Sequence, residues 1–155
     1  MKQLTAADIM SRNPVMVRHD QSIAEVLAVL KSKGISGVPV LDDSGSLCGL
    51  VSLKDIAFDA LFRNADGSGE SGYRVVSGEP SIPVESPQRL FISSSLKARD
   101  IMTPMVFTVQ SDCTLNEIAD DMSKGRVHRL VVLENDAVVG VVSSLDLLKV
   151  IRTCE

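Results

Sequence analysis

Aromatic side chains are scarce in this sequence: they make up 3% of the 155 residues, and tryptophan is absent. Proteins that bind single-stranded nucleic acid usually stack the bases on aromatic rings, so we expect no such partner. Hydrophobic residues nevertheless account for 45% of the chain, which predicts a sizeable core of aliphatic side chains. The formal net charge of −4 also argues against a general binder of nucleic acid or of anionic membranes.

Cysteines and long apolar runs are scarce as well. The three cysteines, Cys48, Cys113 and Cys154, show no Cys-x-x-Cys spacing, so neither a disulfide framework nor a structural zinc site is expected. No signal-like run begins the sequence, and no stretch approaches the ~20 apolar residues that a membrane span requires. We therefore expect a soluble protein of the reducing cytoplasm, with no membrane partner.

The sequence contains an internal repeat. Asp8-Ile9-Met10 recurs as Asp100-Ile101-Met102, and matching residues continue at an offset of 92 and then, after one deletion, of 91. The repeat predicts one domain over residues 8–62 and a second over residues 98–153. Residues 63–97 between them are rich in Gly, Ser and Pro and are expected to form a flexible insertion, acting as a surface loop or as a lid or docking arm. Two short strands, 73–76 and 90–92, are conceivable within it.

Each repeat has the same predicted order of elements: short strand, helix, strand, turn, strand, helix. A Ser or Thr followed three residues later by Glu predicts a capping box at the first helix of each repeat, and a glycine is expected to end each of these helices. Short runs rich in Val and Leu predict the strands. The residues concerned are Ser22, Glu25 and Gly34, then Thr114, Glu117 and Gly125, with strands at 38–41, 47–51, 130–133 and 138–142. The fold class is therefore α/β (α+β).

A strand that runs directly into a helix closes each repeat. Ser52 and Asp55 mark the start of this helix in the first repeat, and Ser143 and Asp146 mark it in the second. Serine followed by Asp three residues later is typical of a helix cap, and a cap alone explains the motif. A helix start after a buried strand is also a place where a phosphate or a hydroxyl-rich ligand binds, and the second copy of the motif favours that reading.

These motifs together resemble the CBS (cystathionine β-synthase) domain, and the tandem pair resembles a Bateman module. The resemblance rests on Asp8-Ile9-Met10, Gly34 to Val40, Gly49 to Asp55, Asp100 to Pro104, Val127 to Val132, and Gly140 to Asp146. It implies two β-α-β-β-α units that pack through their sheets about a pseudo-twofold axis. It also implies a regulatory module that binds AMP, ADP, ATP or S-adenosylmethionine, with or without Mg²⁺, and has no catalytic cofactor.

The resemblance implies two ligand clefts, each formed by both units. In each cleft the Asp would hold the ribose hydroxyls, the Ser would lie near the ribose or phosphate, and aliphatic residues would enclose the adenine. One cleft would contain Ser143, Asp146, Pro14, Val15, Met16, Ile35, Ser36 and Val38. The other would contain Ser52, Asp55, Thr103, Pro104, Val106, Val127, His128, Arg129 and Leu130. Arg126, Arg129 and Lys54 are the phosphate candidates, and Ser36 and Gly37 in place of His128 and Arg129 make the two clefts unequal in charge.

Three classes of function follow from these observations. A regulatory module would transmit ligand occupancy to an unidentified partner protein, and the family leads us to expect a disc-like homodimer. An enzyme is not expected, because the two histidines, His19 and His128, lie in unmatched contexts and no nucleophile–base or metal-ligand arrangement is apparent. The alternative is a structural or dimerisation module that binds no nucleotide, in which both Ser-x-x-Asp motifs are only caps.

Overall fold

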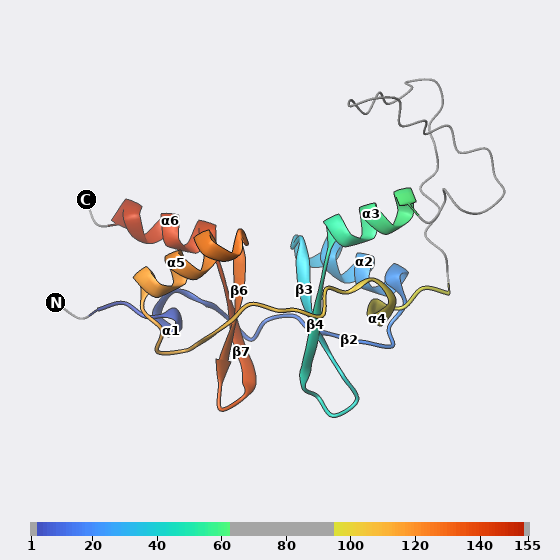
Figure 1. The fold of residues 1–155 in the computed structure, drawn as a ribbon, viewed down its shortest axis with the longest axis horizontal. Helices are drawn as coiled ribbons and strands as arrows, with labels where there is room; N and C mark the ends of the chain where they lie inside the picture. The colour runs from blue at the N-terminus through green and yellow to red at the C-terminus, as the bar shows by residue number, and fades with distance from the viewer. Residues whose placement is uncertain (1–2, 63–94, 154–155) are drawn as a thin grey trace, which may run out of the picture.

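The computed structural model describes residues 3–62 and 95–153, which we call the first and second halves of the chain. Each half begins with a short helix, followed in the first half by the short strand β1, and each then forms a β-α-β-β-α unit, as the resemblance implies (Figure 1). The first half consists of α1 (Ala6–Ile9), β1 (Ser11–Arg12), β2 (Val17–Arg18), α2 (Ile23–Lys33), β3 (Gly37–Leu41), β4 (Leu47–Ser52) and α3 (Leu53–Phe62). The second half consists of α4 (Ala98–Ile101), β5 (Thr108–Gln110), α5 (Leu115–Gly125), β6 (Arg129–Glu134), β7 (Ala137–Ser143) and α6 (Ser144–Thr153). The possible strands at 73–76 and 90–92 lie outside the described residues.

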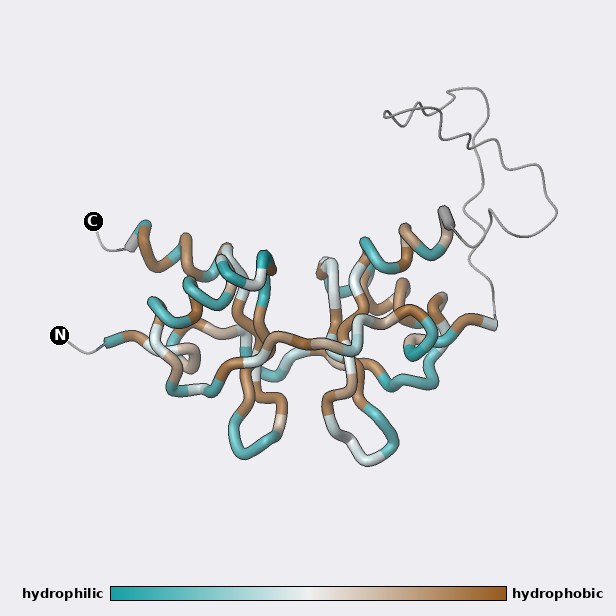
Figure 2. The backbone as a smooth tube through the Cα atoms, in the orientation of Figure 1, coloured by the Kyte–Doolittle hydropathy of each residue, from teal (hydrophilic) through white to brown (hydrophobic). Residues whose placement is uncertain are grey.

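The structure has two small sheets, which stand side by side in the middle of the molecule with the helices on their outer sides (Figure 1). The first sheet has the strand order β2-β3-β4, and the second has the order β1-β7-β6-β5. In both sheets the hairpin is antiparallel and the entering strand is parallel to its neighbour. Apolar positions follow the central strands, whereas the tip of the β6–β7 hairpin is hydrophilic (Figure 2).

The two halves exchange their leading segments. β1 pairs with β7 of the second half, and Thr103 forms an isolated bridge with Leu50 of the first half. The backbone N–H of Leu50 donates to the Thr103 carbonyl at 3.0 Å, and the Thr103 N–H donates back at 2.9 Å. Ala6 of α1 is buried in the core of the second half, and Ala98 of α4 is buried in the core of the first. The start of each sequence repeat therefore packs on the other half. The segment of α1 and β1 crosses to the second half, and the segment from α4 to Thr103 crosses to the first.

Two aliphatic cores lie between the sheets and the helices. Val38 and Val40 of β3 point into the first core, and Leu130 and Val132 of β6 point into the second. Because side chains alternate along a strand, the buried residue between each pair, Pro39 or Val131, faces the other sheet. Burying each Val or Leu contributes roughly 1.5–3 kcal/mol, so these cores account for much of the stability.

The helix starts agree with the sequence analysis. Ser22 accepts from the Glu25 N–H while the Glu25 carboxylate accepts from the Ser22 N–H at 2.8 Å, and Thr114 and Glu117 repeat this capping box. Residues 95–97, expected within the flexible insertion, are bonded to the first half: the Ile23 N–H donates to the Leu96 carbonyl at 3.0 Å. Of the helices that the described residues form, none is long and apolar enough to cross a membrane.

One of the two predicted helix ends is wrong. Gly34 ends α2 in the left-handed conformation (φ 63°), as expected, but in the second half Arg126 takes this position (φ 51°) and Gly125 is the last helical residue. Gly125 is needed for a different reason, because the ring of Phe107 lies against it. A Cβ at residue 125 would lie 2.8 Å from Cε1 of that ring, closer than a real side chain tolerates.

Candidate functional site

Ser52 and Asp55 form a cap at the junction of β4 and α3. The Ser52 N–H and Oγ–H donate to Asp55 Oδ2 at 2.8 Å and 2.6 Å, and the Asp55 N–H donates to Ser52 Oγ at 3.3 Å. The expected capping role is therefore confirmed. Within the part of the chain that the structure describes, however, no group donates to the other carboxylate oxygen, Oδ1. This half-buried carboxylate thus keeps an acceptor for a ligand.

Ser143 and Asp146 form the same cap at the junction of β7 and α6, with donor distances of 2.9 Å and 2.6 Å to Oδ2. Here Oδ1 is also engaged, because Lys149 Nζ lies 2.8 Å from it. Asp146 is buried, with 8% of its surface exposed. Burial raises the pKa of Asp146, but hydrogen bonds from Lys149 and Ser143 outweigh it and hold the pKa below the ordinary value of 3.8.

Replacing Lys149 with methionine is expected to raise the pKa of Asp146. The variant loses the hydrogen bond and the charge of Lys149, which lower this pKa, while the burial that raises it remains. Since the folded-state pKa is the lower one, ionised Asp146 stabilises the fold above pH 3.8, and this contribution is lost as the pH falls through the folded-state pKa. Carboxyl ¹³C shifts followed against pH measure this change. The control is Lys124→Met, which removes the exposed ion pair with Asp120 and is expected to leave Asp146 unchanged. An unchanged pKa in Lys149→Met would contradict the assignment.

A cavity of about 410 Å³ lies beside Asp55, and we call it the Asp55 cavity. Both halves of the chain form it: α3 and the end of β4 contribute from the first half, and the segment after α4 and the start of β6 contribute from the second. Nine of the residues that the sequence analysis selected line it: Ser36, Ser52, Lys54, Asp55, Thr103, Val106, Val127, His128 and Arg129. Ser36 lines this cavity, although the resemblance implied it for the other cleft.

Arg129 bridges the two halves inside this cavity. Its Nη2 donates to Ser36 Oγ at 2.7 Å, and its guanidinium lies over Gly37. A Cβ at residue 37 would lie 2.5 Å from Arg129 Nη1, so the glycine leaves room for the arginine to reach Ser36. With Lys54 and His128 on the same lining, the Asp55 cavity combines one carboxylate with a cluster of basic side chains.

Several predicted site residues lie elsewhere. The side chains of Val38 and Leu130 belong to the two cores, with 0% and 1% exposed, and they do not line the Asp55 cavity. Pro104 lines a separate hollow beside Leu133 and Asp136. Arg126 ends α5 and does not line the Asp55 cavity.

Ser143, Asp146, Pro14, Val15, Met16 and Ile35 do not line the Asp55 cavity either. Ile35 borders a groove between α2 and α3, and Val15 and Ile35 pack against the first core. The second predicted cleft therefore stays a prediction.

Four lining residues were missed: Leu50, Leu53, Met105 and Phe107. Met105 and Phe107 belong to the segment that crosses from α4 to β5, directly beside the predicted Val106. The resemblance places Thr103 and Val106 of this segment beside Asp55, and the structure brings the stretch 103–107 that contains them against the first half as well.

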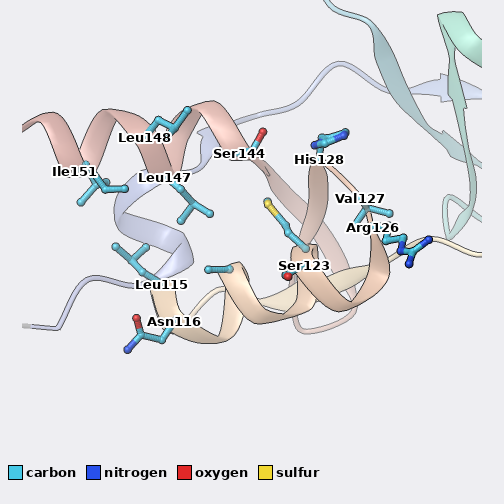
Figure 3. Close-up of a pocket in the computed structure, with 13 residues that line it drawn as sticks. Leu115, Asn116, Ser123, Arg126, Val127, His128, Ser144, Leu147, Leu148 and Ile151 are labelled. Atoms are coloured by element: carbon cyan, nitrogen blue, oxygen red, sulfur yellow. The ribbon is translucent and has the colours of Figure 1, made fainter.

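Two larger apolar grooves, which we call the outer grooves, lie between the two long helices of each half. The α5–α6 groove, of about 760 Å³, includes Leu115, Leu147, Leu148, Ile151 and Arg126, and Leu115 and Leu147 point into the space between the helices (Figure 3). The α2–α3 groove occupies the equivalent place in the first half and also measures about 760 Å³. Asp55 and Asp146 line neither groove. No Asp or Glu among the described residues lines either groove, and the apolar character of the grooves suits protein contacts.

Curated relatives include short and long proteins. The chain is 28% identical over 154 residues to the uncharacterized protein MJ1426 of Methanocaldococcus jannaschii, a match that covers 92% of this chain and 88% of that protein. It is 24% identical to the inosine-5′-monophosphate dehydrogenase of Nitrosopumilus maritimus, covering 95% of this chain and 24% of the enzyme. The chain thus spans about a quarter of that second relative.

Solved structures share the fold. The CBS domain pair of protein MJ0100, in complex with 5′-methylthioadenosine and S-adenosyl-L-methionine, is similar with a TM-score of 0.73 and 22% identity, covering 99% of this chain and 100% of that one. CBSX2 in complex with AMP is similar with a TM-score of 0.69 and 22% identity, covering 97% of each chain. The model of the CBS domain family matches residues 6–59 and 98–153, most of the sequence. The chain therefore belongs to the CBS domain family and carries the domain twice.

Proposed function

We propose that this chain is a regulatory module that binds an adenine nucleotide in the Asp55 cavity and signals its occupancy to a partner protein. One observation carries the proposal: among the residues that the structure describes, none donates to Oδ1 of Asp55, in a cavity that both halves of the chain line. The volume of about 410 Å³ lies within the usual range for small-molecule sites. The adenosine ligands of the MJ0100 pair and of CBSX2 support the class of ligand.

The ribose and the base have matching partners in the cavity. Ionised Asp55 accepts hydrogen bonds only, so Oδ1 suits the two vicinal hydroxyls of a ribose. Leu50, Val106 and Val127 supply aliphatic walls for the faces of the adenine. Leu50 belongs to the first half and Val106 and Val127 belong to the second, so the base would contact both halves.

The charges in the cavity favour a phosphate-bearing ligand. Lys54 and Arg129 are cations, His128 becomes one on protonation, and all three line the same cavity. S-adenosylmethionine carries a positive sulfonium, which these groups would repel. AMP, ADP or ATP is therefore the proposed ligand, and the chain performs binding, not bond-making chemistry.

Regulation requires that the ligand bind one arrangement of the molecule better than another. The Asp55 cavity meets this condition because its walls belong to the two halves, and Arg129 joins them through Ser36. A change in the relative position of the halves alters the cavity and also moves the α2–α3 groove of the first half relative to the α5–α6 groove of the second. A partner protein that contacts the grooves would sense that change.

Isothermal titration of the purified chain with AMP, ADP, ATP and S-adenosylmethionine, each with and without Mg²⁺, tests the proposal. We expect saturable binding of at least one adenine nucleotide and weaker binding of S-adenosylmethionine. If none of these compounds binds, the proposal fails and the chain is instead a structural or dimerisation module.

We also propose that the chain forms a homodimer through its outer grooves. Leu145, Leu148 and Ile151 of α6 are 65%, 58% and 65% exposed, an apolar surface that suits a partner helix. Sedimentation velocity is expected to show a dimer for the wild type and a shift toward monomer for Leu148→Glu. The control is Lys124→Glu, a charge change at an exposed position of α5 outside the α5–α6 groove. A wild-type chain that sediments as a monomer at all concentrations would contradict the dimer.

A further inference from the structure

We infer that Lys149 closes the second ribose-binding carboxylate, so that each chain takes up one adenine nucleotide, at Asp55, and leaves Asp146 without one. The inference rests on the proposed function, because it assigns that function to one of the two repeated motifs. It makes Lys149 a specificity-determining residue.

The two carboxylates differ in the hydrogen bonds that they accept. Both caps use Oδ2 in the same way, with a Ser Oγ–H at 2.6 Å in each. They differ at Oδ1, which accepts from Lys149 Nζ at 2.8 Å in Asp146 and has no donor in Asp55 among the described residues. The residue three positions after Asp55 is Phe58, which offers no cation in the place of Lys149. A nucleotide would thus have to displace a lysine at one motif only.

The two motifs also differ in the basic side chains around them. At equivalent positions of the repeat, Lys54 is replaced by Leu145, His128 by Ser36 and Arg129 by Gly37. Every basic side chain that lines the Asp55 cavity is therefore absent from the corresponding position near Asp146. Asp146 is also buried, with 8% exposed, so a ligand has less access to it. The features that would bind phosphate and ribose occur together on one side only.

Amide NMR of the full chain during an AMP titration tests the inference. We expect shifts at Ser52 and Asp55, and none at Ser143 and Asp146 until AMP is in large excess. Equal shifts at both motifs at the same AMP concentration would overturn the inference and leave the proposed function intact. Shifts at Ser143 and Asp146 alone would overturn the inference and move the proposed site. No shifts anywhere would overturn both.

Substitutions at Phe58 and Lys149 give a second test. Adenosine is the probe, because it carries no phosphate that an added lysine would attract. Phe58→Lys is expected to weaken adenosine binding at Asp55 about fivefold relative to Phe58→Met, the size of effect that a new ion pair on Oδ1 would cause. Lys149→Met is expected to let adenosine shift the Ser143 and Asp146 amides. Equal affinity for Phe58→Lys and Phe58→Met, or unmoved amides in Lys149→Met, would show that position 149 does not close the second carboxylate.

Discussion

Replacing Asp55 with asparagine is expected to weaken binding of an adenine nucleotide about 10- to 100-fold. A hydrogen bond to a charged group contributes roughly 1.5–3 kcal/mol, and each 1.4 kcal/mol is a factor of ten in affinity. Asparagine has one acceptor oxygen where the carboxylate has two, so it cannot accept from the ribose hydroxyls and from the Ser52 donors together, and it carries no negative charge. Isothermal titration with the tightest nucleotide measures the loss.

The control for this variant must separate lost binding from a weakened cap. Ser22→Ala removes the equivalent cap of α2, far from the Asp55 cavity, and should cost about 1 kcal/mol of stability. We expect Ser22→Ala to bind nucleotide like the wild type, although it unfolds at a lower temperature. If Asp55→Asn keeps wild-type affinity, the ribose assignment is wrong.

Replacing Arg129 with glutamine is expected to weaken ATP binding about tenfold and adenosine binding about twofold or less. The difference arises because the guanidinium would contact phosphate, and charged hydrogen bonds are the stronger ones. Glutamine also loses the contact of Arg129 Nη2 with Ser36 Oγ, so a small loss for adenosine is expected through the cavity wall.

Arg126→Gln provides the matched control for Arg129. Arg126 has the same charge and lies three residues earlier, but it lines the α5–α6 groove and not the Asp55 cavity. Its ATP affinity should stay within about twofold of the wild type. Equal losses in the two arginine variants would point to a general effect of net charge and would contradict a phosphate contact at Arg129.

Most of the fold was predictable because the same pattern of elements occurs in both repeats of the sequence. The capping boxes at Ser22 and Thr114 and the strand-to-helix junctions at Ser52 and Ser143 depend on local chemistry, which a sequence displays directly. The resemblance to the CBS domain then supplied the pseudo-twofold arrangement and the pairing of Asp55 with Val106 and Val127.

The rest depends on contacts between segments far apart in the chain. Residues 103–107 cross to the first half, which brings Met105 and Phe107 to the cavity. No local sequence pattern predicts that these two side chains line it. The same crossing explains Gly125, which is small because Phe107 lies on it and not because it ends α5. Whether Asp55 or Asp146 can accept a hydrogen bond from a ligand also depends on which side chain already contacts its Oδ1 atom. Such a contact is visible only in the structure.

A crystal structure of the chain with its tightest-binding adenine nucleotide tests the central claim most directly. The account predicts ribose hydroxyl oxygens within about 2.5–3.0 Å of Asp55 Oδ1, with the phosphates beside Lys54 and Arg129. A nucleotide seated in the α5–α6 groove, or beside Asp146 with the Asp55 cavity empty, would contradict it.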